Sequence, residues 1–84
     1  MPQGSFFPDE VVSRQPCVTL IGRKLLRIEQ HTGLLAYRED ALVFRSQEGD
    51  IVVSGTELHI SRYTSDEAEI RGEITGVAIG GGVV

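Results

Sequence analysis

Two histidines and one cysteine are the residues of this 84-residue chain whose types are best suited to metal or nucleophilic chemistry. Cys17 and His31 are 14 residues apart, and His31 and His59 are 28 residues apart. Zinc sites instead use ligands in closely spaced pairs, so the spacing predicts no metal site. We interpret His59 as a solvated cross-strand neighbour and His31 as a hydrogen-bonding residue of a turn, and neither as a catalytic base.

A group of carboxylates could suggest a calcium site, but its spacing does not fit one. Asp66, Glu67, Glu69 and Glu73 are close in sequence, but a calcium loop folds its oxygen ligands around one centre. Alternate residues of a strand point along one face, so these side chains indicate a solvated strand face. The chain has no Gly-x-Ser-x-Gly elbow, P-loop or dinucleotide fingerprint, and no helix is expected after Gly80–Gly82 to complete a phosphate site. We therefore expect no enzyme and no cofactor.

Composition narrows the class of protein further. Eight basic and twelve acidic residues give a net charge of −4, without the basic clusters interleaved with aromatics that nucleic-acid binding requires. A single cysteine cannot form an intrachain disulfide, which favours a cytoplasmic setting. Residues 1–8 lack the features of a secretory signal, and no apolar run approaches the roughly 20 residues that span a bilayer. The composition predicts a soluble protein without nucleic acid or a membrane span.

Period-two alternation, interrupted by glycine-centred turns, dominates the sequence and predicts an all-β fold. In the clearest segment Leu58 and Ile60 share one face, while Glu57, His59 and Ser61 share the other. We expect seven or eight short strands. The strands are predicted over Cys17–Ile21, Lys24–Gln30, Leu34–Tyr37, Ala41–Arg45, Ile51–Val53, Thr56–Tyr63 and Glu67–Thr75, with a further short one after Gly76.

Glycines indicate where this surface turns or bends. Ser54–Thr56 is predicted to be a turn between two strands. Gly72 removes a side chain from the apolar row, which is typical of a bend, a bulge or a close backbone approach. The apolar row moves from even to odd positions at Gly76, so we expect a bulge or corner there.

Apolar anchors recur every seven to nine residues, at Ile28, Leu35, Leu42, Ile51 and Leu58. This spacing fits a curved antiparallel meander or small stacked arches of a β-solenoid, and the sequence leaves both open. We divide the chain into an N-terminal arm over residues 1–16, a β-domain over 17–79 and a flexible glycine-rich tail over 80–84. A domain this small has a thin stability margin, so we expect a homo-oligomer or a protein partner.

One stretch resembles a known family. The residues Ile28, Glu29, Gln30, His31 and Gly33, followed by Tyr37, are similar to the Ile-Glu-Asn-His-x-Gly motif and later tyrosine of the YabP/YqfC family of sporulation proteins. Pro16 and Gly22 match the lead that precedes this motif, and the glycine-and-strand blocks at 49–60 and 69–74 follow it in order. The resemblance covers roughly residues 8–79 and is closer to the YqfC branch. Gln30 departs from the usual asparagine, which puts in doubt any role that needs the shorter amide in a tight turn.

The resemblance implies a non-enzymatic protein of the sporulating cell that acts as an interaction or assembly module. It implies a membrane-bound partner of the YqfD type, through which this cytoplasmic chain would lie at a membrane. We predict partner contacts at Ile28, Glu29, Gln30, His31 and Gly33. The alternative is a self-assembling structural scaffold of the solenoid type.

Overall fold

The computed structural model describes residues 15–83 and builds them into one antiparallel β-sheet. The strands are β1 (Cys17–Ile21), β2 (Leu25–Glu29), β3 (Gly33–Tyr37), β4 (Ala41–Arg45), β5 (Ile51–Tyr63), β6 (Glu67–Ile79) and β7 (Gly82–Val83). This confirms the all-β prediction. The described residues contain no helix of the length and apolarity needed to cross a membrane.

The sheet has the order β1-β2-β6-β5-β4-β3, and β7 pairs with β6. Strands β3 to β6 form a meander, whereas the connection from β2 to β3 passes from one side of the β5–β6 hairpin to the other. Every pairing is antiparallel. Stacked solenoid arches would pair in parallel, so the structure has the antiparallel architecture of the two that the sequence left open.

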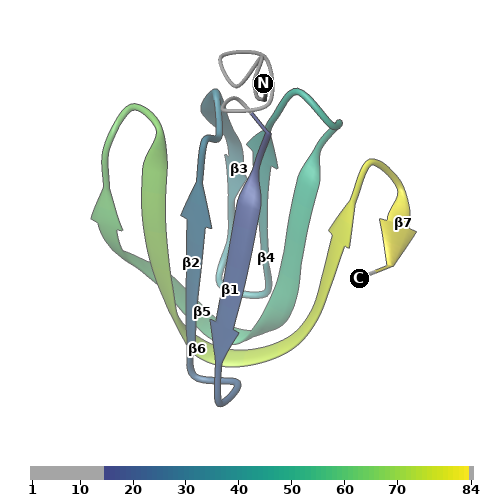
Figure 1. Ribbon diagram of the computed structural model, residues 1–84. Helices are drawn as coiled ribbons and strands as arrows, with labels where there is room; N and C mark the ends of the chain where they lie inside the picture. The colour runs from purple at the N-terminus through teal and green to yellow at the C-terminus, as the bar shows by residue number, and fades with distance from the viewer. Residues whose placement is uncertain (1–14, 84) are drawn as a thin grey trace, which may run out of the picture.

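A long, bent hairpin of β5 and β6 carries the rest of the molecule (Figure 1). The predicted turn over Ser54–Thr56 is wrong, because β5 runs through it without interruption. The reason is a bend with close backbone approach: a Cβ on Gly72 would lie 2.6 Å from the carbonyl oxygen of Glu57, and a Cβ on Gly55 would collide with the carbonyl oxygen of Glu73. Gly55 therefore permits a bend within a strand, where the sequence suggested a turn between strands.

Bulges produce the bend. Glu57 and Leu58 lie together opposite Gly72, and Thr75 is the extra residue where Ser54 pairs with Gly76. The predicted close approach at Gly72 is thus confirmed, and the predicted bulge at Gly76 is found at its neighbour. Each inserted residue disrupts the ladder and increases the local twist, so the hairpin curves back over itself.

Two short hairpins dock on the bend in the same manner. In the β1–β2 turn, the carbonyls of Lys24 and Arg23 accept hydrogen bonds from the N–H groups of Gly72 and Ile74, at 3.2 and 2.8 Å. In the β3–β4 turn, the carbonyls of Asp40 and Glu39 accept from Gly55 and Leu58, at 3.1 and 2.8 Å. The backbone groups freed by the bulges are therefore satisfied from both sides.

The core lies between the two docked hairpins, which face each other inside the bent β5–β6 hairpin (Figure 1). Its buried members are Leu26, Ile28, Leu42, Phe44, Ile51, Val53, Leu58, Ala68, Ile70 and Ile74. The predicted anchor Leu35 is wrong: it is 46% exposed, because a register shift between Leu34 and Ala36 turns it outward. Leu34 packs against the core in its place.

The two ends of the chain correspond to the predicted arm and the predicted tail. The predicted arm over 1–16 lies outside the described residues except for Gln15 and Pro16. Over the predicted tail, Gly80 and Gly81 form a turn that returns Gly82–Val83 to pair with Ala78 and Ile79. The tail is thus a short antiparallel return rather than an unpaired extension, and its flexibility stays a prediction.

Candidate functional site

His31 of the predicted partner-binding motif is the one buried polar residue in the described part of the chain, with 2% of its surface exposed. Its ring stacks on Tyr63 at a centroid distance of 5.2 Å and lies tilted against Phe44 at 5.2 Å. Nδ1 accepts a hydrogen bond of 3.1 Å from the Gly33 N–H. His31 therefore closes the turn between β2 and β3 from inside, as the sequence predicted.

Since Nδ1 accepts, the neutral ring carries its proton on Nε2. Nε2 is buried and has no hydrogen-bond partner among the described residues. The aromatic faces of Phe44 and Tyr63 enclose the ring, but they leave this donor unsatisfied.

The backbone of the motif is tied to the β5–β6 turn. The carbonyl of Asp66 accepts hydrogen bonds from the N–H groups of Gln30 and His31, at 2.6 and 3.2 Å. Gln30 has a φ of +67°, in the left-handed region that asparagine tolerates better than other non-glycine residues. The departure from the family's asparagine thus falls at the position where the shorter amide suits the backbone.

The structure brings the five predicted site residues together but gives them unlike environments. Ile28 is fully buried in the core and His31 is buried between aromatic rings, so neither side chain reaches a partner's surface. Glu29, Gln30 and Gly33 are half-buried and open to contact. Ile28 and His31 therefore hold the turn from inside, and partner binding at the five residues stays a prediction.

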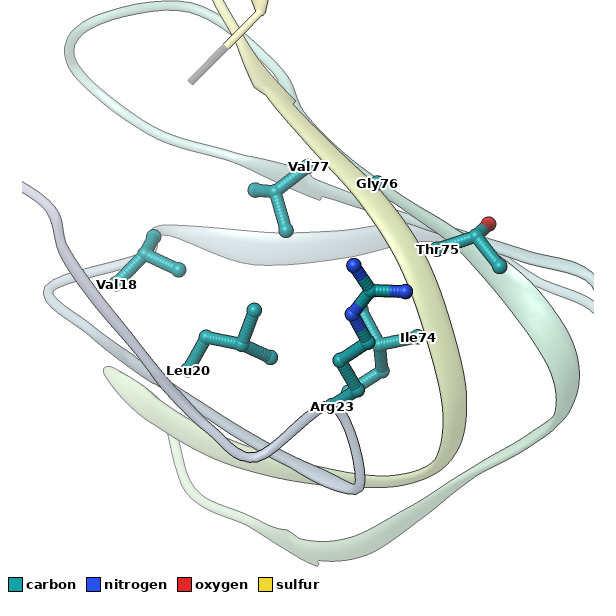
Figure 2. A pocket seen from close by; sticks show the side chains of 7 residues that line it. All are labelled: Val18, Leu20, Arg23, Ile74, Thr75, Gly76 and Val77. Atoms are coloured by element: carbon teal, nitrogen blue, oxygen red, sulfur yellow. The ribbon is translucent and has the colours of Figure 1, made fainter.

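A second site, which the sequence did not indicate, lies between β1 and the later half of β6. A groove of about 240 Å³ is lined there by Val18, Leu20, Arg23, Ile74, Thr75, Gly76 and Val77. Figure 2 shows the side chains of Val18, Leu20, Ile74 and Val77 turned toward one another, with the Arg23 guanidinium extending over them. The groove is therefore apolar within and cationic at one end.

Strand β1 borders this groove as the edge of the sheet. Leu20 and Ile21 are 47% and 50% exposed, and none of the five residues of β1 is charged. Proteins usually protect such an edge with charges, prolines or a covering segment. Among the described residues, β1 pairs with β2 alone, so its outer edge has no strand partner there.

The strand at the opposite edge, β3, makes a side-chain contact with β5. The Tyr37 hydroxyl of β3 accepts a hydrogen bond of 3.0 Å from the Ile60 N–H of β5. This contact joins the edge strand of that side to the outer part of the bent hairpin.

The carboxylates that suggested a solvated strand face make ion pairs there. Glu73 pairs with Lys24 at 2.7 Å, Glu69 with Arg27 at 3.3 Å, and Glu67 with Arg62 at 3.5 Å. No three metal-ligating side chains gather within residues 15–83. What the described surface offers chemically is backbone pairing at β1, an apolar groove and one cation, which suits binding of an extended segment.

Sequence reasoning missed this groove for a specific reason. The neutral stretch Cys17–Ile21 was recognised as a strand, but its place at the edge depends on the β2-to-β3 crossing, which leaves no local signal. The run of five uncharged residues before Gly22 is compatible with an edge strand, but β3 is equally uncharged, so charge alone does not single out β1.

Comparisons with known proteins agree with the motif. The family model described as the YabP family matches residues 13–81. The chain is 30% identical over 67 residues to a Bacillus subtilis (strain 168) protein named "Uncharacterized protein YqfC", and this match covers 80% of the chain and 72% of the relative. No solved structure matches the chain.

Proposed function

This chain belongs to the YabP family, and from that membership we propose that it serves in endospore formation as a non-enzymatic protein that acts by binding another protein. The match covers most of the described domain, including the turn around His31 and both edge strands. The family resemblance supplies the sporulation role, and the surface supplies the mode of action.

The observation that carries the binding role is the unprotected edge at β1. Exposed Leu20 and Ile21 lie on a neutral strand whose outer side has no partner among the described residues. An edge of this kind recognises another chain by main-chain hydrogen bonds, with specificity from neighbouring side-chain pockets.

We propose a membrane protein of the YqfD type as the partner. The chain would act from the cytoplasm and lie at a membrane only through this partner. The accessible motif residues Glu29, Gln30 and Gly33 offer it a second contact region beside β3.

Co-purification tests this proposal. The affinity-tagged full chain would be produced in sporulating cells together with the membrane partner, and the complex would be isolated in detergent. We expect the partner to be retained on the tagged chain and absent from a parallel preparation with an unrelated tagged protein. Normal spore yield after deletion of the gene, together with no retained partner, would contradict the proposal.

A further inference from the structure

The groove beside β1 is bordered by two unpaired strand edges. β1 pairs only with β2. The edge of β6 that faces β1 is paired over most of its length. β2 pairs with residues 67–71 and β7 pairs with Ala78 and Ile79. Between them, carbonyls of the β1–β2 turn accept hydrogen bonds from the N–H groups of Gly72 and Ile74. Residues 75–77 have no pairing on that side within the described structure, so the sheet is interrupted there by a slot.

We propose that this slot takes one extended segment of a partner protein, which adds a strand beside β1, places a branched aliphatic side chain in the groove and presents a carboxylate to Arg23. This inference rests on the proposed function and names its contact surface. The slot ends at the β1–β2 turn on one side and at β7 on the other, so it admits a short strand rather than a folded domain (Figure 1).

The size of the groove favours a side chain over a free small molecule. Its volume of about 240 Å³ falls below the roughly 300–1,000 Å³ typical of small-molecule sites. Val18, Leu20, Ile74 and Val77 provide the apolar surface (Figure 2). Burial of one branched aliphatic side chain among them would supply most of the side-chain contribution to affinity.

Charge selects the kind of partner segment. Arg23 extends over the groove and forms no ion pair with the described residues, while the neighbouring Lys24 is already paired with Glu73. No acidic side chain lines the groove. A carboxylate at the Arg23 end of the incoming segment would meet an uncompensated cation.

Three loops and the β1 edge of a second copy of the chain fit the slot less well than a segment of another protein. The loops over Arg38–Asp40, Ser46–Asp50 and Thr64–Asp66 contain no aliphatic residue, and the uncharged β1 of another copy would bring no carboxylate to Arg23. We therefore assign the slot to a different protein.

A random library of eight-residue peptides displayed on phage provides the probe, selected on the purified full chain. We expect enriched peptides to carry Val, Ile or Leu at alternate positions with Asp or Glu at one end. Their dissociation constants, measured by fluorescence anisotropy, should rise about tenfold or more in Leu20→Lys, since an inward charge blocks the edge. Leu35→Lys is the matched control, because Leu35 is equally exposed on the opposite edge strand, at 46% against 47%.

Arg23→Glu offers a second variant, which reverses the charge at the end of the groove and keeps the aliphatic residues that line it. We expect it to weaken acidic peptides about threefold and to favour the same peptides with Lys in place of the acid. Peptides that bind both lysine variants equally well, or a library without enrichment, would overturn the inference.

A second copy of the chain, or a segment of the same chain, in the slot would give a different experimental result. A dimer in sedimentation equilibrium that Leu20→Lys dissociates would assign the slot to a second copy and overturn the inference. Slow hydrogen exchange of the β1 amides in the monomeric full chain would show that the chain fills its own slot, with the same consequence. If the membrane partner is retained equally by the wild type and Leu20→Lys, the proposed function stands and only this inference fails.

Discussion

The β1–β2 and β3–β4 hairpins dock in the same manner, but their outer strands have different surroundings. Each hairpin buries two apolar residues of its inner strand, Leu26 and Ile28 in one and Leu42 and Phe44 in the other. Each also lends turn carbonyls to the bend of β5 and β6.

Their outer strands differ. β3 is joined to β5 through the Tyr37 hydroxyl, whereas β1 is bordered by the groove. The shared features therefore hold the fold together, and the difference is that the described groove lies beside β1.

The largest expected effect tests the shared bend. Gly72→Ala would place a Cβ 2.6 Å from the Glu57 carbonyl at a φ of +137°, and we expect it to lower the free energy of unfolding by about 4 kcal/mol. Gly55→Ala, its counterpart on β5, should cost about 3 kcal/mol through collision with the Glu73 carbonyl. Urea denaturation measures both.

Gly76→Ala is the control for the bend, since a Cβ there has no heavy atom within 4 Å and the φ is not in the left-handed region. We expect a change of less than about 0.5 kcal/mol. Full stability in Gly55→Ala combined with unfolding in Gly72→Ala would show that the two sides of the bend are not equivalent.

The next effect compares the inner strands. Leu26→Ala and Leu42→Ala each remove a fully buried side chain from corresponding positions, so each should cost about 3 kcal/mol. Thermal unfolding should give similar losses for the two. A difference of more than about 2 kcal/mol between the two losses would mean that one hairpin relaxes around its cavity. The two inner strands would then not contribute equally to stability.

The sequence predicted the bounds of two strands, one outer and one inner, and the buried face of the inner strands. The predicted ranges Cys17–Ile21 and Ala41–Arg45 coincide with β1 and β4. Leu26 and Ile28 were placed on one face of β2, because alternation reports burial directly. Local patterns cannot report which strands become neighbours. The crossing from β2 to β3, and with it the free edge of β1, depends on the bend that Gly55 and Gly72 permit.

The candidate site was predicted only in part, for a related reason. The sequence located His31 at a turn, and the structure bears that out with the bond to Gly33. It could not show that Phe44 and Tyr63 enclose the ring, since these contacts join residues far apart in the chain. Ser54–Thr56 was misread because glycine serves equally in a turn and in a close approach.

A smaller effect tests the contact between β3 and β5. Tyr37→Phe removes the hydroxyl that accepts from the Ile60 N–H, and we expect a loss of about 0.5 to 1 kcal/mol with faster hydrogen exchange at Ile60. Tyr63→Phe is the control, because Tyr63 is similarly exposed and its hydroxyl makes no hydrogen bond to a described residue. Unchanged exchange at Ile60 in Tyr37→Phe would show that another contact closes this side.

The smallest expected effect, at the exit of β2, is stabilising. Gln30 holds a φ of +67°, while Ser46 at the exit of β4 lies outside the left-handed region and uses its hydroxyl to accept from Glu48 and donate to Gly49. Asparagine tolerates the left-handed conformation better than glutamine, so Gln30→Asn should raise the free energy of unfolding by about 0.5 kcal/mol. Gln47→Asn makes the same replacement in the β4–β5 turn. Because Gln47 does not have a positive φ, this change should not raise the free energy of unfolding. Equal effects of the two changes in urea denaturation would mean that the strain at Gln30 is not what separates the exits of the two hairpins.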